Sequence, residues 1–302
     1  QASFFPTSPR ETIIYLATIF LAFAFTIAYV TLKELLTNKI LSASEVRNYS
    51  NAPLVGEIPH FKEKNLSLYD NEFISAQFRQ LRAALGLFNK TITNKKILVT
   101  SSIAGEGKTF ISNTLANSIS YSGKKVVLVD SDFQNPQISI DYNLDQSDGL
   151  SDFLENNILP QQILKKTDIQ NLFIVPAGTS NKNSSELFLN GKIEDLINYL
   201  GENFDHIIFD APSVNLATDA YILSEICDST IYLVRQQYTP KIFIKKLDDN
   251  IRIKRLNRMI LVYNDIKPRG FFKQKSVTAH WANIKNKAVK KNRKLIEKRA
   301  IV

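Results

Sequence analysis

The pattern of hydrophobic and polar positions divides the chain into an apolar segment, a mixed polar stretch and a long alternating region. Residues 12–32 carry no charge. At about 1.5 Å per residue, a helix of this length spans the roughly 30 Å hydrocarbon core of a bilayer. A buried core helix is the alternative, but such a helix is seldom apolar on every face over this length. We therefore expect one transmembrane helix, preceded by an external, proline-containing approach at residues 1–11.

The charges beside this segment predict its orientation. Only Arg10, next to Glu11, precedes it, whereas the basic residues Lys33, Lys39, Arg47, Lys62 and Lys64 follow it. Lysine and arginine favour the cytoplasmic side of a membrane. We expect the chain to lie in the inner, cytoplasmic membrane with everything after the helix in the cytoplasm. Because the sequence begins with Gln1 rather than methionine, we also expect a fragment or a processed product.

Residues 33–70 are mixed and polar and are interrupted by Pro53 and Pro59. This stretch is interpreted as a juxtamembrane linker that ends in a short extended piece. A helix from about residue 71 to 88 is predicted next, because Phe78, Leu81 and Leu85 recur at helical spacing.

From residue 96 onwards short apolar runs alternate with segments long enough for crossover helices. The runs occupy residues 97–100, 126–129, 173–175, 207–209, 231–234 and 260–262. Consecutive apolar positions are typical of strands buried on both faces. The predicted fold class is α/β, a doubly wound, mainly parallel sheet of the P-loop NTPase type, over residues 71–270.

Composition adds that the chain is globular and that its positive charge is confined to one end. The net charge is +9. Residues 271–302 hold ten lysines and arginines against Glu297, so 10 − 1 = +9 and residues 1–270 are formally neutral. We expect this basic tail to bind anionic lipid. The alternatives are a solvated tail and a docking site for acidic proteins or nucleic acid, but the rest of the chain gives no reason to expect a nucleic-acid partner.

Cysteine and histidine exclude two classes of site. The chain has one cysteine, Cys227, and three histidines far apart in the sequence. No intrachain disulfide can form, and neither residue type has the spacing of metal ligands.

Candidate chemistry begins at the segment AGEGKTF, residues 104–110, which follows the first apolar run and opens a helix. Gly105 and Gly107 allow consecutive backbone N–H groups to face a phosphate. Lys108 can reach the β- and γ-phosphates, and the Thr109 hydroxyl can coordinate Mg²⁺. Ser102 stands where this pattern usually has its first glycine. The predicted nucleotide-binding residues of the loop are Ala104, Gly105, Glu106, Gly107, Lys108, Thr109 and Phe110.

Carboxylates follow two other apolar runs. Asp130 and Asp132 come after residues 126–129, and positions i and i+2 of a strand share a face. Asp210 follows residues 207–209, where a carboxylate can bind magnesium or its water. Because ligands bind at the carboxyl ends of such strands, the three motifs together predict a site for ATP and Mg²⁺.

The motifs GEGKT, VVLVDSDFQNP and HIIFDAPSV, in this order after a membrane helix, resemble the cytoplasmic domain of bacterial tyrosine kinases (BY-kinases). These kinases belong to polysaccharide co-polymerases. The resemblance covers residues 6–267 and includes PLVGEIP, GLSDFLEN and DSTIYLVR. Partition-type ATPases carry a lysine where this chain has Ile103, which favours the kinase branch.

The resemblance implies a membrane-anchored kinase that transfers the ATP γ-phosphate to protein tyrosine in control of exopolysaccharide synthesis or export. Its partners would be polysaccharide synthesis and export proteins. It implies catalytic roles for Lys108, Asp130 and Asp132, and metal ligation by Thr109, Asp132 and Asp210. Asn264 would read the adenine edge.

Two departures from the family pattern leave alternatives open. The oligomerisation motif E-x-x-R-x-x-R has Ala76 in place of its acid before Arg79 and Arg82, although Glu72 lies one turn earlier. A homo-oligomer is therefore a weaker expectation. No tyrosine follows Tyr263, so a tail cluster cannot be the phosphate acceptor. An ATP-binding co-polymerase subunit that switches assembly without kinase activity, and a P-loop ATPase, are the alternatives.

Overall fold

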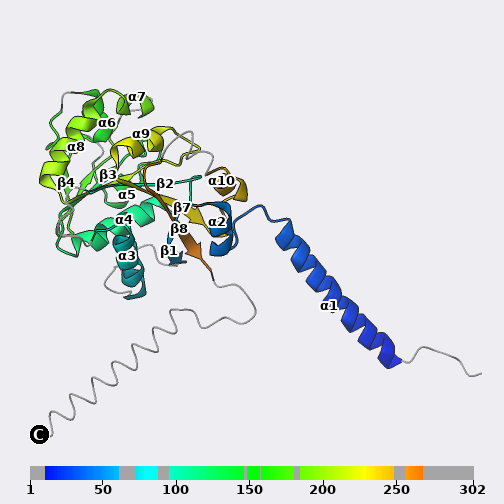
Figure 1. Cartoon of the computed structure of the whole chain (residues 1–302). Helices are drawn as coiled ribbons and strands as arrows, with labels where there is room; N and C mark the ends of the chain where they lie inside the picture. Colours follow the sequence, from blue (N-terminus) through cyan, green and yellow to red (C-terminus); the bar gives the residue numbers. More distant parts are fainter. Residues whose placement is uncertain are drawn as a thin grey trace, which may run out of the picture. The chain divides into compact units, whose positions relative to one another are not determined.

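The computed structural model describes residues 11–60, 72–87, 95–145, 148–156, 158–179, 184–247 and 256–267. It divides into two compact units, residues 1–39 and 40–302 (Figure 1). Residues 1–10 of the predicted approach and the basic tail, residues 271–302, lie outside the described residues.

The first unit is a single long helix, α1 (Glu11–Leu35). The most apolar 18-residue window within Thr12–Leu35 has a mean hydropathy of 2.3, and none of it is buried within the protein. The long apolar helix predicted at this position is confirmed. Length and composition suffice for a membrane span.

The second unit is built on one eight-stranded sheet in the order β1-β8-β7-β2-β6-β3-β5-β4. The strands are β1 (Leu54–Pro59), β2 (Lys95–Ser101), β3 (Val126–Asp130), β4 (Lys165–Lys166), β5 (Leu172–Val175), β6 (His206–Asp210), β7 (Ser229–Arg235) and β8 (Met259–Ile266). All pairs are parallel except β4 with β5. The predicted fold class and the six expected strands are confirmed.

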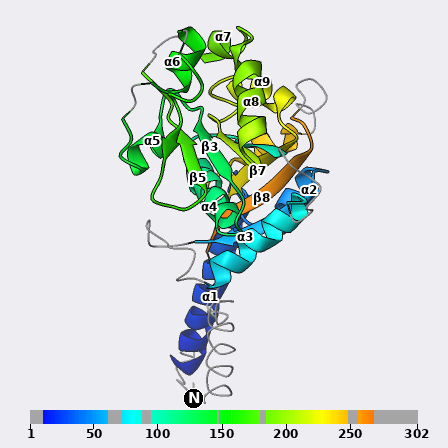
Figure 2. The ribbon, with the colours of Figure 1, turned by 90° about the vertical axis from the view of Figure 1, so that its left-hand side faces the viewer.

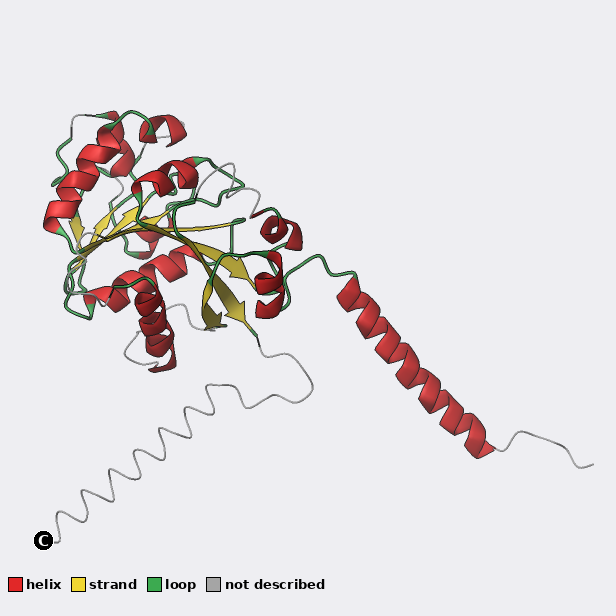
Figure 3. Ribbon diagram, viewed as in Figure 1, coloured by secondary structure: helices red, strands yellow, loops and turns green. Residues whose placement is uncertain are grey.

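Helices cover both faces of this sheet, as Figures 2 and 3 show. They are α2 (Ala43–Tyr49), α3 (Glu72–Ala84), α4 (Lys108–Ser120), α5 (Gln137–Asp141), α6 (Leu150–Glu155), α7 (Ser184–Phe188), α8 (Lys192–Asn203), α9 (Asp219–Ile226) and α10 (Lys241–Lys245). Alternate strand residues enter different cores: Val99 packs with α3 and α4, whereas Leu98 packs with α8 and α9. The apolar runs are continuous because each strand is buried on both sides.

The stretch from residue 40 to 59 belongs to this compact unit, so the prediction of a linker over residues 33–70 was wrong for it. Ile40 is fully buried, and β1 pairs with β8 at the edge of the sheet. The short extended piece predicted at the end of this stretch is confirmed as β1, which exposes Glu57 beside buried Ile58. Ile40 is also fixed by backbone bonds to the loop after β7, at 2.9 Å to Thr239 and 2.8 Å to Gln237.

Candidate nucleotide site

The glycine-rich loop connects the end of β2 to the first residue of α4, Lys108. Gly105 and Gly107 have φ angles of 82° and 97°, in the left-handed region that favours glycine. A Cβ at Gly107 would lie 2.4 Å from the side-chain nitrogen of Asn264, so a larger residue would also collide there. The backbone therefore has the left-handed conformation at both glycines, as the phosphate-loop interpretation requires.

A pocket of about 250 Å³ opens beside this loop, at the carboxyl ends of the strands. Six residues predicted from the motif line it: Ala104, Gly105, Gly107, Lys108, Thr109 and Phe110. Asp132 also lines it, together with Gln134, Asn135, Gln137, Pro212 and Leu216. The sequence analysis assigned these last five residues no role in the site, although Gln134, Asn135 and Pro212 lie within the quoted motifs.

Asp210 lies directly behind the loop. The Thr109 hydroxyl donates a hydrogen bond of 2.7 Å to Asp210 Oδ2. Burial raises the pKa of Asp210 to about 6, and the hydrogen bond from Thr109 and the charge of Lys108 oppose the rise. The structure thus brings together the hydroxyl and the carboxylate that were predicted to share a metal.

Asp130 is the register neighbour of Asp210 on the adjacent strand. Its Oδ2 accepts hydrogen bonds from the Ser139 backbone N–H at 3.1 Å and the Ser139 hydroxyl at 3.0 Å. Burial raises the pKa of Asp130 to about 7, with a further contribution from the charge of Asp210. Ser139, which sequence reasoning missed, is therefore the residue that holds Asp130 in place.

Asp132 is the carboxylate closest to the open part of the site, since it lines the pocket and Asp130 does not. One oxygen, Oδ1, accepts the Asn135 backbone N–H at 3.1 Å. Burial raises the pKa of Asp132; the charge of Lys108 lowers it and the charge of Asp219 raises it. Asp219 is itself held by the Ser185 hydroxyl at 2.6 Å.

The donor set fits a magnesium ion. Asp130 Oδ1 and Asp210 Oδ1 are buried and have no hydrogen-bond partner within the described ranges. A buried carboxylate oxygen without a donor favours a bound cation. No group of three or more acidic, histidine or cysteine side chains in the described residues could hold a metal by itself. Magnesium usually takes only one or two carboxylates and completes its shell with phosphate and water.

Two of the predicted residues, Glu106 and Asn264, do not line the pocket. The carboxylate of Glu106, which is fully buried, accepts the Ile103 backbone N–H at 3.0 Å and the Thr239 hydroxyl. Burial raises the pKa of Glu106. The Asn264 amide nitrogen donates 2.9 Å to the Glu106 carbonyl, and Asn264 is not among the residues that line the pocket. Its structural contact is with the loop itself.

The two arginines of the oligomerisation motif have different environments on α3. Arg79 is exposed, whereas Arg82 is buried and donates from Nη1 to the Ser118 carbonyl at the end of α4. Burial and the charge of Arg79 lower the pKa of Arg82. Arg82 therefore contributes to packing within the chain, and Arg79 is the arginine that is open to another subunit.

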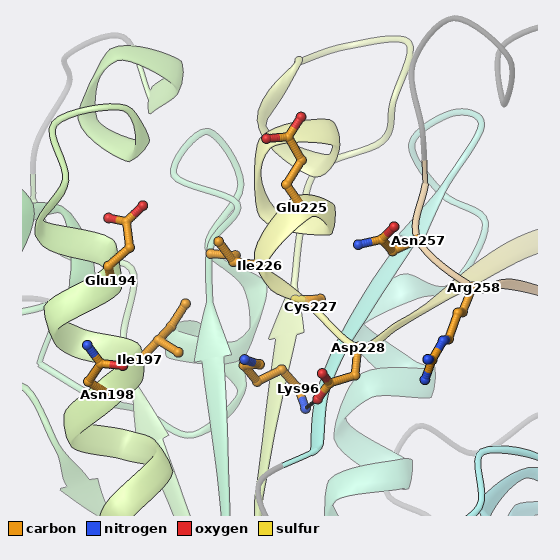
Figure 4. A pocket seen from close by; sticks show the side chains of 10 residues that line it. All are labelled: Lys96, Glu194, Ile197, Asn198, Glu225, Ile226, Cys227, Asp228, Asn257 and Arg258. Atoms are coloured by element: carbon orange, nitrogen blue, oxygen red, sulfur yellow. Dashed lines mark hydrogen bonds between the residues drawn. The ribbon is translucent and has the colours of Figure 1, made fainter.

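A larger pocket, about 520 Å³, lies at the opposite, amino ends of β2 and β7 (Figure 4). Basic Lys96 and Arg258 stand there among acidic Glu194, Glu225 and Asp228. The Lys96 backbone N–H donates 2.7 Å to the Asp228 carboxylate. Because charges of both signs are interspersed, this pocket offers no net positive field for a phosphate, and it holds none of the predicted site residues. The smaller pocket therefore remains the candidate site.

Sequence and structure comparisons find known proteins that are similar to this chain. The family model for an AAA domain matches residues 94–255. The chain is 32% identical over 159 residues to tyrosine-protein kinase CpsD of Streptococcus pneumoniae serotype 4 (strain TIGR4), covering 52% of this chain and 70% of that protein.

Two further similarities extend over more of the chain. It is 24% identical over 249 residues to tyrosine-protein kinase ptk of Acinetobacter johnsonii, covering 78% of this chain but only 34% of that kinase. The solved structure of the chimerical protein CapA2B2 superposes with a TM-score of 0.67 at 27% identity, covering 74% of this chain and 99% of the chimera. The chain thus spans about a third of the length of the Acinetobacter relative.

Proposed function

The chain belongs to the family of bacterial capsule tyrosine kinases, the BY-kinases, and on that premise we propose that it transfers the γ-phosphate of ATP to protein tyrosine side chains. The acceptors belong to the control of exopolysaccharide synthesis or export. The observation that carries the proposal is the pocket in which Lys108, Thr109 and Asp132 meet, with the unpartnered carboxylate oxygens of Asp130 and Asp210 behind it.

Each residue has a distinct task in this proposal. Bound ATP would supply the phosphoryl group and leave as ADP, and magnesium would neutralise the charge that develops during the transfer. Lys108 would hold the β- and γ-phosphates, and Thr109 and Asp210 would hold the metal. Asp132 accepts the phenol proton of the acceptor tyrosine, because it is the carboxylate on the open side and burial raises its pKa toward that of a general base. Asp130 supports Asp132 and the metal from the buried side.

A second candidate is an ATP-binding co-polymerase subunit that switches assembly without transferring phosphate. It is favoured by the basic tail, because residues 271–302 contain no tyrosine. A P-loop ATPase that releases free phosphate is the third. All three functions need the same pocket, so they are separated by the fate of the γ-phosphate.

The test is incubation of the full chain, in detergent, with γ-labelled ATP and Mg²⁺. Label on tyrosine supports the proposal, free phosphate supports an ATPase, and binding without turnover supports the switching subunit. Lys108→Met should weaken ATP binding roughly tenfold or more, since a hydrogen bond to a charged group contributes about 1.5–3 kcal/mol. Its thermal midpoint should match wild type. Lys166→Met, at an exposed lysine on β4, is the control; unchanged affinity in Lys108→Met would contradict the phosphate-loop assignment.

A further inference from the structure

Three consecutive carbonyl groups of the glycine-rich loop accept hydrogen bonds from side chains on its outer side. The Tyr238 hydroxyl donates to Ala104 O at 3.0 Å. Arg235 Nη1 donates to Gly105 O at 2.6 Å, and Asn264 Nδ2 donates to Glu106 O at 2.9 Å. These donors come from β7, the loop after it and β8, all outside the motif.

Because the peptide bond is planar, a contact that fixes a carbonyl group also fixes the direction of the following N–H group. In a trans peptide the C=O and the following N–H point in opposite directions. A carbonyl fixed toward β7 and β8 therefore turns the next N–H toward the pocket. Three fixed carbonyls in a row turn three successive N–H groups, those of residues 105, 106 and 107, to the same side. Successive inward N–H groups form an anion-binding nest.

We infer that Arg235, Tyr238 and Asn264 are positioning residues that hold the loop in its phosphate-binding conformation before a nucleotide arrives. The inference rests on the nucleotide-binding part of the proposed function and not on phosphate transfer. It also gives Asn264 a different task from reading adenine. The ligand of the loop is the polyphosphate chain, which the oriented backbone N–H groups bind whatever base is attached.

The donors are themselves held in place. Arg235 forms an ion pair with Asp265, at 2.8 Å from Nε and 2.7 Å from Nη2, and Asp265 also pairs with His60. The Arg235 guanidinium stacks on the Tyr238 ring at 5.0 Å. A Cβ on Gly105 would lie 2.7 Å from the Tyr238 hydroxyl, so the tyrosine lies against the loop. Because Arg235 is paired with Asp265 and lies over the Tyr238 ring, these donors can define the loop rather than follow it.

The experiment uses the full chain and two ligands, Mg-ATP and magnesium tripolyphosphate, which has the phosphates but no base. Tyr238→Phe removes one oxygen. It should weaken binding of both ligands about three- to tenfold, as the loss of one hydrogen bond predicts. Tyr121→Phe is the matched control, because Tyr121 is 39% exposed against 37% for Tyr238 and lies at the far end of α4. The thermal midpoint is measured alongside, and neither variant should move it appreciably.

Asn264→Ala separates the two roles of the amide. If Asn264 positions the loop, the variant binds tripolyphosphate and ATP more weakly to the same degree. If Asn264 contacts adenine, the variant binds only ATP more weakly. Loss for ATP alone, or a Tyr238→Phe protein that binds like Tyr121→Phe, would overturn the inference. A wild-type chain that binds both ligands but labels no tyrosine contradicts only the kinase proposal. A wild-type chain that binds neither overturns both.

Discussion

At the scale of single residues, the burial of Asp130 and Asp210 opposes the negative charge that each carboxylate needs in order to bind a metal. Asp130 and Asp210 lie side by side with almost no exposed surface, and each has one oxygen without a partner in the described part of the chain. Burial of two neighbouring carboxylates raises both pKa values and disfavours their charged forms. The arrangement lowers the stability of the protein without metal, and it is explained if a cation compensates the charge.

The substitution Asp210→Asn should therefore stabilise the metal-free protein. The folded-state pKa of Asp210, about 6, is above the ordinary value of 3.8, so its contribution to stability falls as pH rises from about 4 to 6 and stays low above that. The thermal midpoint of the variant should exceed wild type at pH 8, on the order of 5 °C, and the difference should shrink toward pH 4. Melting curves without Mg²⁺ and nucleotide at both pH values test this. A midpoint below wild type at pH 8 would contradict it.

Sequence reasoning located the residues whose signal is local. Lys108 and Thr109 belong to one short motif, and Asp130, Asp132 and Asp210 end recognisable apolar runs. Arg235 and Tyr238 were missed because their contacts with the loop cross 130 and 134 positions of the sequence and have no fixed spacing. The same limit applies to Glu106, which was predicted to bind nucleotide but is buried and accepts a hydrogen bond from Thr239, 133 positions later.

At the scale of elements, α6 is fixed by backbone contacts with the loop after β5. The N–H groups of Leu150 and Ser151 donate to Pro176 O and Ala177 O, at 2.8 and 2.9 Å. The Asp152 carboxylate accepts the Gly149 N–H at 2.9 Å and the Thr179 N–H at 3.1 Å. The start of α6 and the loop after β5, which the sequence separates by more than twenty positions, therefore form one packed unit at the carboxyl end of β5.

Gly149→Ala should loosen this unit. A Cβ on Gly149 would stand 2.2 Å from the Gly178 nitrogen and 2.7 Å from the Pro176 carbonyl, and backbone atoms cannot rotate away. Overpacking of this kind costs about 1–3 kcal/mol, so the thermal midpoint should fall by several degrees. Gly56→Ala is the control, because its Cβ would meet only Val262 at 3.5 Å. Equal midpoints for the two variants would show that the contact is softer than its geometry indicates.

At the scale of the whole molecule, the parallel order of the strands places the phosphate loop and the three aspartates together at the carboxyl ends of β2, β3 and β6. The fold class was predictable because six strands are buried on both faces, and that burial gives each a continuous apolar run. The pairing of the two edge strands was not. β4 is two residues long, too short for any periodicity, and β1 was predicted only as a short extended piece at the end of a linker. Their pairing depends on strands far away in the sequence, β5 and β8.

The N-terminal helix has the internal chemistry that a lipid environment requires. The hydroxyls of Thr18, Thr26 and Thr31 donate to carbonyls one turn earlier at 2.7, 2.7 and 2.8 Å. These three hydroxyls therefore keep partners without water. The side chains that it exposes are large and apolar, such as Phe20 at 74% and Phe25 at 75%. A soluble protein would have to cover such a surface, and a bilayer covers it directly.

Charges placed at the middle of this helix should therefore block its insertion, and the same charges at its end should not. Phe23→Asp with Phe25→Asp puts two carboxylates near the centre of Thr12–Leu35. Each costs about 3 kcal/mol at the bilayer midplane, so the pair opposes insertion by about 6 kcal/mol. Leu35→Asp with Leu36→Asp adds the same charge at the end of the helix, where the carboxylates reach the headgroups. After alkaline extraction of membranes, wild type and the end variant should remain in the pellet and the central variant should be released. If wild type is released as well, α1 is not a membrane span; if the central variant stays in the pellet, something other than the apolar character of α1 holds the protein there.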